Sequence, residues 1–212
     1  MNRLKLFVLV TVFTMCLSFQ SMAVYRYTET FSTGLNLWIP SSIHHNVTHE
    51  LAGGNGGGYA QAITGNSFGG IQNLESEAFT GDATGVSSFH ADIRLFSGTL
   101  TSVYFRFREG ADANGWRYFL PVNAIGDSWN TFSVTFDPTW SDGDAIANGW
   151  SQEPSTASWA EVMSDLHSVN IRAFGADGSV IGYDNVGFVP EPTTAIFGAV
   201  MLGGVMMRRR RG

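Results

Sequence analysis

The chain contains little cysteine, and its central part contains little positive charge. Cys16 is the single cysteine among 212 residues and lies in an apolar N-terminal segment, so the rest of the chain can form no internal disulfide. Residues 24–190 contain 17 acidic residues, six arginines and no lysine, which gives a net charge of −11 against −6 for the whole chain. A domain this acidic has no broad basic surface for phosphates, so nucleic acid is excluded as a partner.

The N-terminal segment has the features of a secretory leader. Arg3 and Lys5 precede an apolar stretch over residues 6–17, and Ser21-Met22-Ala23 provides small residues at the positions before a cleavage site. This order of charge, apolar run and small residues is typical of a signal peptide. We therefore expect residues 1–23 to be removed and the remainder to be exported.

The C-terminal segment has three parts. Pro190-Glu191-Pro192 is followed by a 15-residue apolar run over residues 193–207 and by four basic residues: Arg208, Arg209, Arg210 and Arg211. A helix over the run would be about 22 Å long, which is shorter than the roughly 30 Å hydrocarbon core. The arginine stems can lie along lipid and extend it. Positive charge favours the cytoplasmic side, so the main domain is expected outside.

This C-terminal arrangement resembles a PEP-CTERM sorting signal, the substrate of exosortase. The resemblance rests on residues 189–192, the apolar run and the tetra-arginine end. It implies an inner-membrane intermediate, processing by an exosortase-type protease, and release to the cell surface or extracellular matrix of a Gram-negative bacterium that makes exopolysaccharide. The expected organisation is a signal peptide (1–23), one domain (24–188) and the sorting signal (189–212). A permanent C-terminal anchor is the alternative.

The central domain is predicted to be all-β. Apolar and polar residues alternate with period 2 over residues 87–95, 101–108 and 130–136, which indicates strands with one buried face. Weaker strands are expected over residues 25–31, 59–64, 71–74, 117–121, 169–174 and 180–188. One helix is expected over residues 159–167, because Ser158 and Glu161 form a capping-box pattern. Many short strands with one helix favour a jelly-roll-type β-sandwich.

Two further resemblances agree with that fold. Thr28-Glu29-Thr30-Phe31, with Leu35 and Trp38 after it, is similar to the opening of bacterial carbohydrate-binding-module-like jelly rolls, and residues 181–186 are similar to their closing strand. Residues 56–59 and 78–82 are similar to laminin-B-type sandwiches. The resemblance to the jelly rolls implies a structural calcium ion held by Glu29 and Asp184, with backbone carbonyls completing the shell. Glycines at 53–58 permit a close backbone approach. Alternatively, Asp184 tethers a strand end through hydrogen bonds and Glu29 is solvated.

Exposed aromatic rings are the expected sugar-binding groups. Trp116, Trp140 and Trp150 lie in or beside loops rich in Gly, Asp and Asn, so we predict that they present faces on which sugar rings stack. Three arginines, Arg106, Arg108 and Arg117, offer planar donors to acidic sugars. The alternative for each tryptophan is burial in the core.

Other polar clusters carry less specific signals. Asp142-Gly143-Asp144 is expected to be a turn or a calcium loop, and His44, His45 and His49 a surface loop or a zinc site. The pair Glu75 and Glu77 resembles the E-x-E pair of laminarinase-like sandwiches, which would imply glycoside hydrolysis.

Together these features predict an exported, non-catalytic protein that binds polysaccharide. The first alternative is a structural or adhesive matrix protein without a glycan site. The second is a laminarinase-like hydrolase that uses Glu75 and Glu77.

Overall fold

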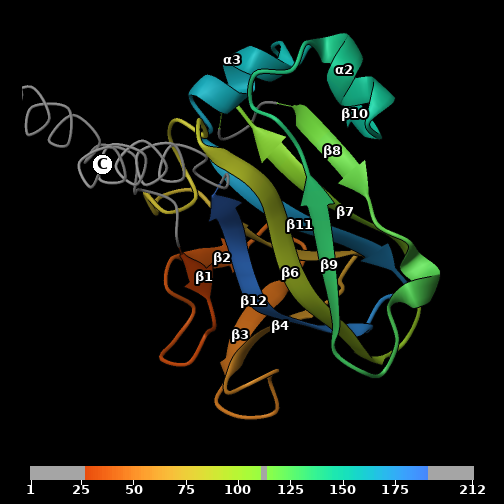
Figure 1. Ribbon diagram of the computed structural model, residues 1–212. Coiled ribbons are helices and arrows are strands. Elements are labelled where there is room, and N and C mark those ends of the chain that lie inside the picture. The colour runs from red at the N-terminus through yellow and green to blue at the C-terminus, as the bar shows by residue number, and fades with distance from the viewer. Residues whose placement is uncertain (1–26, 111–113, 191–212) are drawn as a thin grey trace, which may run out of the picture.

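The protein is a sandwich of two six-stranded antiparallel sheets (Figure 1). The computed structural model describes residues 27–110 and 114–190. Sheet A has the strand order β3-β4-β12-β6-β9, with β1 paired to β12. Its strands are β1 (Thr28–Glu29), β3 (Asn46–Glu50), β4 (Tyr59–Ile63), β6 (Val86–Ser97), β9 (Asn130–Thr135) and β12 (Val180–Pro190).

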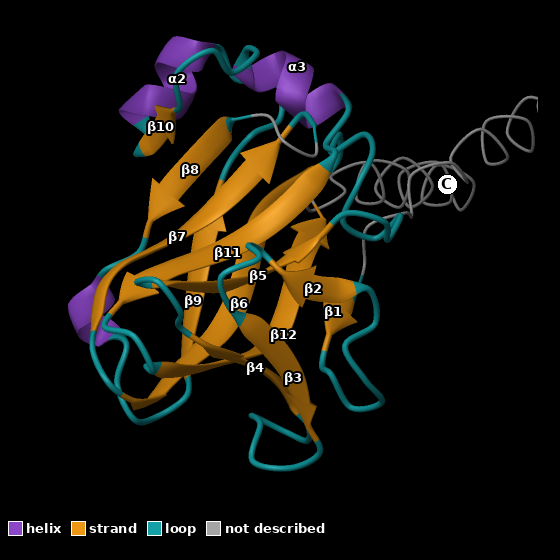
Figure 2. Cartoon of the chain, turned by 180° about the vertical axis from the view of Figure 1, so that it is seen from behind, coloured by secondary structure: helices purple, strands orange, loops and turns teal. Residues whose placement is uncertain are grey.

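Sheet B has the strand order β10-β8-β7-β11-β5-β2 and faces sheet A across the core (Figure 2). Its strands are β2 (Trp38–Pro40), β5 (Phe68–Asn73), β7 (Leu100–Arg108), β8 (Gly115–Phe119), β10 (Trp150–Gln152) and β11 (Ser168–Gly175). The two-sheet, mostly β fold confirms the predicted β-sandwich.

Aromatic residues from both sheets fill the core. Phe89 of β6 meets Phe105 and Phe107 of β7 edge-on, with ring centroids 4.8 and 5.7 Å apart. Phe188 of β12 joins them, 5.1 Å from Phe89. All four rings are buried, and each buried ring of this size contributes about 2 kcal/mol by removal of apolar surface from water. The period-2 pattern therefore decides which face of each strand points inward.

Two short α-helices lie together at one end of the sandwich (Figures 1 and 2). They are α2 (Asp142–Ala147) and α3 (Trp159–Ser164), and a 3-10 helix, η1 (Val122–Ala124), follows β8. The capping box at Ser158 and Glu161 is confirmed. Helix α3 ends before the predicted residue 167, because Leu166 instead forms a β-bridge with Gly81.

The prediction of a single helix is wrong, because residues 142–147 form α2 rather than a turn. Ser141 accepts a hydrogen bond from the Asp144 amide, and the Asp144 carboxylate in turn accepts from the Ser141 amide. The same reciprocal capping as in α3 therefore starts this helix. The Asp142-Gly143-Asp144 segment is its first turn and not a calcium loop.

The nine predicted strands are present with altered ends, and three strands were missed. The missed strands are β2, β3 and β10, all of five residues or fewer, which is too short for alternation to stand out.

The predicted signal peptide (1–23), the apolar run (193–207) and the tail residues Glu191, Pro192, Arg208, Arg209, Arg210 and Arg211 lie outside the described residues. Pro190 is described as the last residue of β12. Within residues 27–110 and 114–190, no helix is long and apolar enough to span a membrane.

Candidate functional site

The pairing of the first and last strands brings Glu29 and Asp184 onto adjacent strands. In the β1–β12 register Glu29 lies opposite Val186, two residues from Asp184. Glu29 is 2% exposed and Asp184 is 1% exposed. Within the described part of the chain, neither carboxylate forms an ion pair. Two buried carboxylates without a cationic partner are costly unless hydrogen bonds or a metal ion stabilise them.

Backbone amides and polar side chains donate to both groups. The Glu29 carboxylate accepts from the amide of Phe31 (2.7 Å), the side chain of Asn36 (3.1 Å) and the hydroxyl of Tyr27 (2.9 Å). The Asp184 carboxylate accepts from the amides of Asn55 (2.7 Å) and Asn185 (2.8 Å). These contacts fix the orientation of both carboxylates, so Glu29 is not the solvated residue of the alternative reading.

Asp92 is a third buried carboxylate that sequence reasoning missed. It lies directly opposite Asp184 in the β6–β12 register and is 3% exposed. Its Oδ2 accepts from the side-chain amides of Asn55 and Asn185, each at 2.7 Å, and its Oδ1 accepts from Thr131 at 2.5 Å. The period-2 pattern of residues 87–95 does place Asp92 on the polar face, but its proximity to Asp184 depends on strand pairing.

Burial raises the pKa of Asp184 from 3.8 to about 6, and the charges of Asp92 and Glu29 add to this effect. The hydrogen bonds from the two asparagine amides act in the opposite direction. The cluster therefore holds more negative charge at neutral pH than its surroundings favour, which is the electrostatic condition for attracting a cation.

The glycine loop over residues 53–58 packs tightly against these carboxylates. A Cβ atom on Gly54 would lie 2.3 Å from the carbonyl oxygen of Gly58 and 2.7 Å from Asp184 Oδ2. A Cβ atom on Gly58 would lie 2.5 Å from the carbonyl oxygen of Phe31 and 2.8 Å from that of Glu50. Carboxylate and carbonyl oxygens are the ligands that calcium prefers, so the local donor set fits this ion.

The described residues contain no group of three or more His, Cys, Asp or Glu side chains placed to hold a metal ion. A calcium shell at Glu29 and Asp184 would therefore need backbone carbonyls. The histidines do not gather into a site of their own. His45 is buried and donates to the Gly70 carbonyl oxygen (2.6 Å), whereas His49, on β3, donates to that of Phe31 (2.6 Å) beside the glycine loop.

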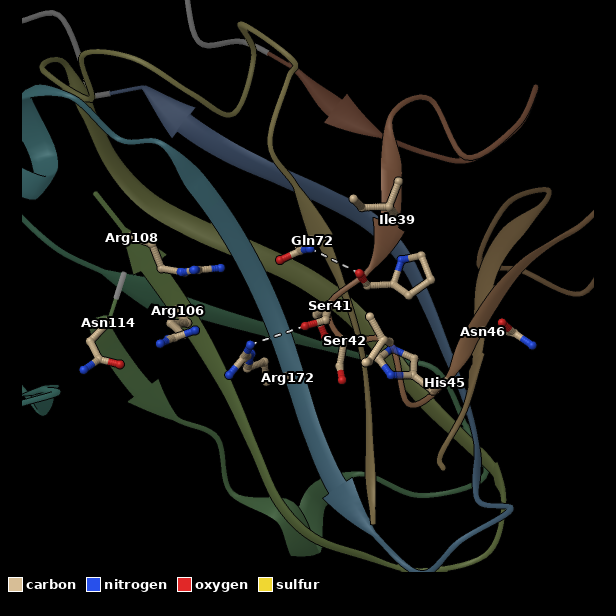
Figure 3. A pocket seen from close by; sticks show the side chains of 12 residues that line it. Ile39, Ser41, Ser42, His45, Asn46, Gln72, Arg106, Arg108, Asn114 and Arg172 are labelled. Atoms are coloured by element: carbon tan, nitrogen blue, oxygen red, sulfur yellow. Dashed lines mark hydrogen bonds between the residues drawn. The ribbon is translucent and has the colours of Figure 1, made fainter. Parts of the chain in front are cut away.

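A cavity of about 750 Å³ lies on the outer face of sheet B (Figure 3). We call it the groove. Its lining combines arginine, amide, hydroxyl and apolar side chains from β2, the segment after β2, β5, β7 and β11, together with Asn114. The lining residues are Ile39, Pro40, Ser41, Ser42, Ile43, His45, Asn46, Gln72, Arg106, Arg108, Asn114 and Arg172.

Strand alternation places the arginines in the groove. Phe105 and Phe107 of β7 and Ile171 of β11 point into the core, so Arg106, Arg108 and Arg172 point to the opposite face. Figure 3 shows their side chains on the same side of the two strands. Because β7 and β11 are neighbours in the sheet, the groove gathers three guanidinium groups.

Hydrogen bonds from β5 and β11 hold the end of β2 and the segment after it within the groove. Arg172 donates to the Ser41 carbonyl oxygen (3.3 Å), and Gln72 donates to that of Pro40 (3.2 Å). Gly70 has a φ of +140°, and a Cβ atom there would lie 2.3 Å from the Ile171 carbonyl oxygen. A side chain at position 70 would clash with β11, so this position requires glycine.

Several polar atoms of the groove have no hydrogen-bond partner among the described residues. They are Ser41 Oγ, His45 Nδ1, Gln72 Oε1 and Arg172 Nε. Burial lowers the pKa of His45, so its ring is neutral at pH 7. Its Nε2 donates to Gly70, which leaves Nδ1 as an acceptor. Buried polar atoms are normally paired, so this mixture of donors and acceptors suits a ligand rich in hydroxyl groups.

Four aromatic rings cross the same face beside the groove. Phe119, Tyr104, Phe174 and Phe68 come from β8, β7, β11 and β5, with successive centroids 5.2, 6.0 and 4.9 Å apart. We call them the aromatic row. Phe119 is 48% exposed, Phe174 is half-buried, and Tyr104 (4%) and Phe68 (8%) are buried. Arg117 lies 5.1 Å over the Phe119 ring, and Arg172 lies 5.0 Å over the Phe68 ring. Alternation marks these positions as outward-facing, but only strand order aligns them.

The expectation that tryptophans present the sugar-binding faces is wrong for Trp116 and Trp150. Trp116 is 0% exposed and Trp150 is 2% exposed. Both pack against Trp159, with centroids 5.5 and 4.9 Å from it. Trp140 is half-buried against the same ring at 6.1 Å. These rings close the end of the core beneath α2 and α3, because loops alone would leave that end open to water.

Glu75 and Glu77 are exposed and lie in the loop after β5, not on a strand face. Neither residue lines the groove. The structure therefore does not place the E-x-E pair in the setting that hydrolysis by two carboxylates requires.

Comparison with known proteins identifies solved structures of similar fold. A search with protein-family models found no match, and neither did a search of curated proteins. An exo-β-agarase matches 78% of this chain with a TM-score of 0.56 at 10% identity, and this chain spans 25% of that enzyme.

Two structures of carbohydrate-binding modules also match. The family 11 module of the Clostridium thermocellum cellulosomal cellulase Lic26A-Cel5E has a TM-score of 0.50 at 13% identity, covering 79% of this chain and 96% of the module. The module CtCBM11 has a TM-score of 0.50 at 14% identity, covering 82% and 99%. Identities this low show the β-sandwich fold alone.

We predict that Asp184 makes the metal-free protein less stable as pH rises from about 4 to 7. Its folded pKa of about 6 exceeds the ordinary 3.8, so the folded state binds more protons in this window and loses stability as they leave. Two pH units correspond to at most about 3 kcal/mol in the free energy of unfolding. Chemical denaturation in EDTA at several pH values should show this loss of unfolding free energy in the wild type.

The Asp184→Asn variant should not show this loss of stability between pH 4 and 7. The Asp127→Asn variant, which changes an exposed residue, is the matched control and should show the same loss as the wild type. Equal pH profiles for Asp184→Asn and the wild type would show that Asp184 titrates normally.

Proposed function

We propose that this protein is an exported, non-catalytic glycan-binding protein built on a carbohydrate-binding-module-like jelly roll. The groove and the aromatic row on the outer face of sheet B form its binding surface. The observation that carries the proposal is the presence, on one sheet face, of a 750 Å³ cavity with unpartnered polar atoms beside four aligned aromatic rings.

A polysaccharide matches both parts of this surface. Sugar rings carry apolar C–H faces that pack on aromatic rings, and Phe119 offers the most exposed ring of the row. Sugar hydroxyl groups both donate and accept, so they can pair with Gln72 Oε1 and His45 Nδ1 as well as with arginine donors. The extent of this surface, from Phe119 on β8 to the groove, favours a chain over a single sugar.

The fold comparisons support the same function. Two of the matching structures are carbohydrate-binding modules, and this chain covers nearly the whole length of each. The third is an exo-β-agarase of which this chain spans a quarter. Similarity to complete binding modules, together with the position of Glu75 and Glu77 outside the groove, favours binding over hydrolysis.

Phe119→Ala is expected to weaken glycan binding about five-fold, because an aromatic contact contributes about 1 kcal/mol. The strongest ligand from an array of neutral and acidic polysaccharides would be titrated by calorimetry. Ile146→Ala removes an exposed apolar side chain from α2 and serves as the control with unchanged affinity. An array without any signal would refute glycan binding, and equal affinity of Phe119→Ala and wild type would refute this surface.

We also propose that a structural calcium ion binds at Glu29 and Asp184, with carbonyl oxygens near the glycine loop. The support is the fit of two buried carboxylates and tightly packed carbonyls to a hard cation. Such an ion ties β1 to β12 and takes no part in chemistry.

Calcium is expected to raise the thermal midpoint at pH 7.5, and the effect should fade as pH falls through about 6, because protons compete for Asp184. Scanning fluorimetry with EDTA or millimolar calcium measures both effects. Glu29→Gln should abolish the calcium response, whereas Asp127→Asn should keep it. A wild-type midpoint that is indifferent to calcium at every pH would refute the site.

The sequences of the two termini support the proposed export and processing. A secretory leader, a Pro-Glu-Pro turn, an apolar run and four arginines together match export followed by exosortase-type processing. The domain would then reach the cell surface or extracellular matrix, where polysaccharide is its expected partner.

Intact-mass spectrometry of the exported protein is expected to give a species that begins at Val24 and lacks residues 193–212. Expression in a strain without the exosortase-type protease should retain the apolar run and the tetra-arginine end. An exported species that keeps Arg208 to Arg211 in the wild-type strain would contradict processing.

A further inference from the structure

Positive charge is concentrated on one face of an otherwise acidic domain. Residues 24–190 contain six arginines and 17 acidic residues. Four of these arginines lie on the outer face of sheet B, on β7, β8 and β11: Arg106, Arg108, Arg117 and Arg172. Three of the four line the groove, and none of the described residues that line it is Asp or Glu.

One carboxylate partly neutralises this face. Glu153, which follows β10, forms an ion pair with Arg106, and Arg106 Nε donates to Glu153 Oε2 at 2.7 Å. The other oxygen of Glu153 lies 3.7 Å from Arg117 Nη1. The Gly115 amide also donates to Glu153. Its negative charge is therefore already shared before any ligand binds.

Arg172 has no acidic partner in the described part of the chain. Its contacts there are the Ser41 carbonyl oxygen at 3.3 Å and the Phe68 ring at 5.0 Å, and its Nε has no hydrogen-bond partner among the described residues. Burial chiefly, and the charge of Arg172 next, lower the pKa of Arg106, which is the sign expected for guanidinium groups held close together. A half-buried cation with neutral contacts favours an incoming anion.

We propose that the groove selects an anionic polysaccharide, whose carboxylate or sulfate groups bind Arg172. This inference rests on the proposed glycan-binding function and specifies its ligand class. A planar guanidinium pairs with a carboxylate or sulfate through two parallel hydrogen bonds. A neutral polysaccharide would bury Arg172 without neutralising it, so the groove discriminates against such a ligand.

The ligand would thus lie with its hydrophobic ring faces on Phe119 and Phe174, the accessible rings of the aromatic row, and its acidic groups toward Arg172. These two elements are adjacent, because Arg172 pairs with Tyr104 in the β7–β11 register and lies two residues from Phe174. Alternating contact with apolar faces and charged substituents matches the repeating chemistry of a uronate or sulfated chain.

The test compares matched polysaccharides that differ in charge alone. The probes are polygalacturonate with its carboxyl-reduced counterpart, and dextran sulfate with dextran. The full chain is used with residues 208–211 replaced by glutamine, so that the terminal arginines cannot attract the polyanions. Affinity is measured by calorimetry at 50 and 300 mM NaCl.

We expect at least ten-fold tighter binding of one charged probe than of its neutral counterpart, with a clear loss of affinity at high salt. The better of the two charged probes distinguishes a carboxylate-binding from a sulfate-binding groove. Arg172→Gln should reduce that affinity about ten-fold. Arg94→Gln is the matched control, because Arg94 lies on β6 of sheet A over the Phe96 ring and should leave affinity unchanged.

Equal binding of charged and neutral probes would overturn the anionic inference and leave glycan binding intact. Charge-selective binding that Arg172→Gln and Arg94→Gln leave equally unchanged would overturn the assignment to the groove. No binding of any of the four probes, with array binding of other neutral glycans, would also overturn the inference. No glycan signal at all refutes the proposed function itself. Should Arg172→Gln fail to fold, the charge and salt dependence of the parent chain decide the outcome.

Discussion

The register between β7 and β11 is the constraint on which both the core and the groove depend. Phe105 and Phe107 of β7 lie opposite Ile171 and Val169 of β11, while Tyr104 and Arg106 lie opposite Arg172 and Asn170. A slip of one residue in either strand would move its arginines into the core and its apolar residues into water. The stability of the sandwich therefore enforces the geometry of the groove, since the two sets of side chains cannot be moved separately.

Charge is divided between the two outer faces of the sandwich. Sheet A carries the buried carboxylates of Asp92 and Asp184, and sheet B carries the groove arginines. An apolar core about 10 Å thick separates such layers, so neither group neutralises the other at contact distance. The charged groups of each face are therefore stabilised by polar groups on the same face or by a bound ligand. The carboxylates use asparagine amides and the glycine loop. On sheet B, Arg106 and Arg117 contact Glu153, whereas Arg172 has no acidic partner in the described part of the chain.

The sequence was sufficient to predict features that depend on local pattern. Alternation identified the long strands, the Ser158 and Glu161 pair identified a helix start, and the outward positions of Arg106 and Arg108 followed from period 2. Features that depend on strand order were not predictable. Asp92 becomes part of the carboxylate cluster only through β6–β12 pairing. The burial of Trp116 and Trp150 was not predictable either, because glycine-rich flanks indicate exposure, whereas both rings lie on strands and pack against Trp159 of α3.

The two candidate sites respond to acid in different ways. The carboxylate cluster changes charge in mildly acidic solution, because the pKa of Asp184 is raised to about 6 by burial and by its acidic neighbours. The groove does not, since its arginines stay protonated and burial keeps His45 neutral to lower pH. Acidification would therefore weaken the binding of any cation between β1 and β12 before it alters the charge of the groove. The groove can therefore keep its charge while Asp184 is protonated, because the two groups lie on different sheets.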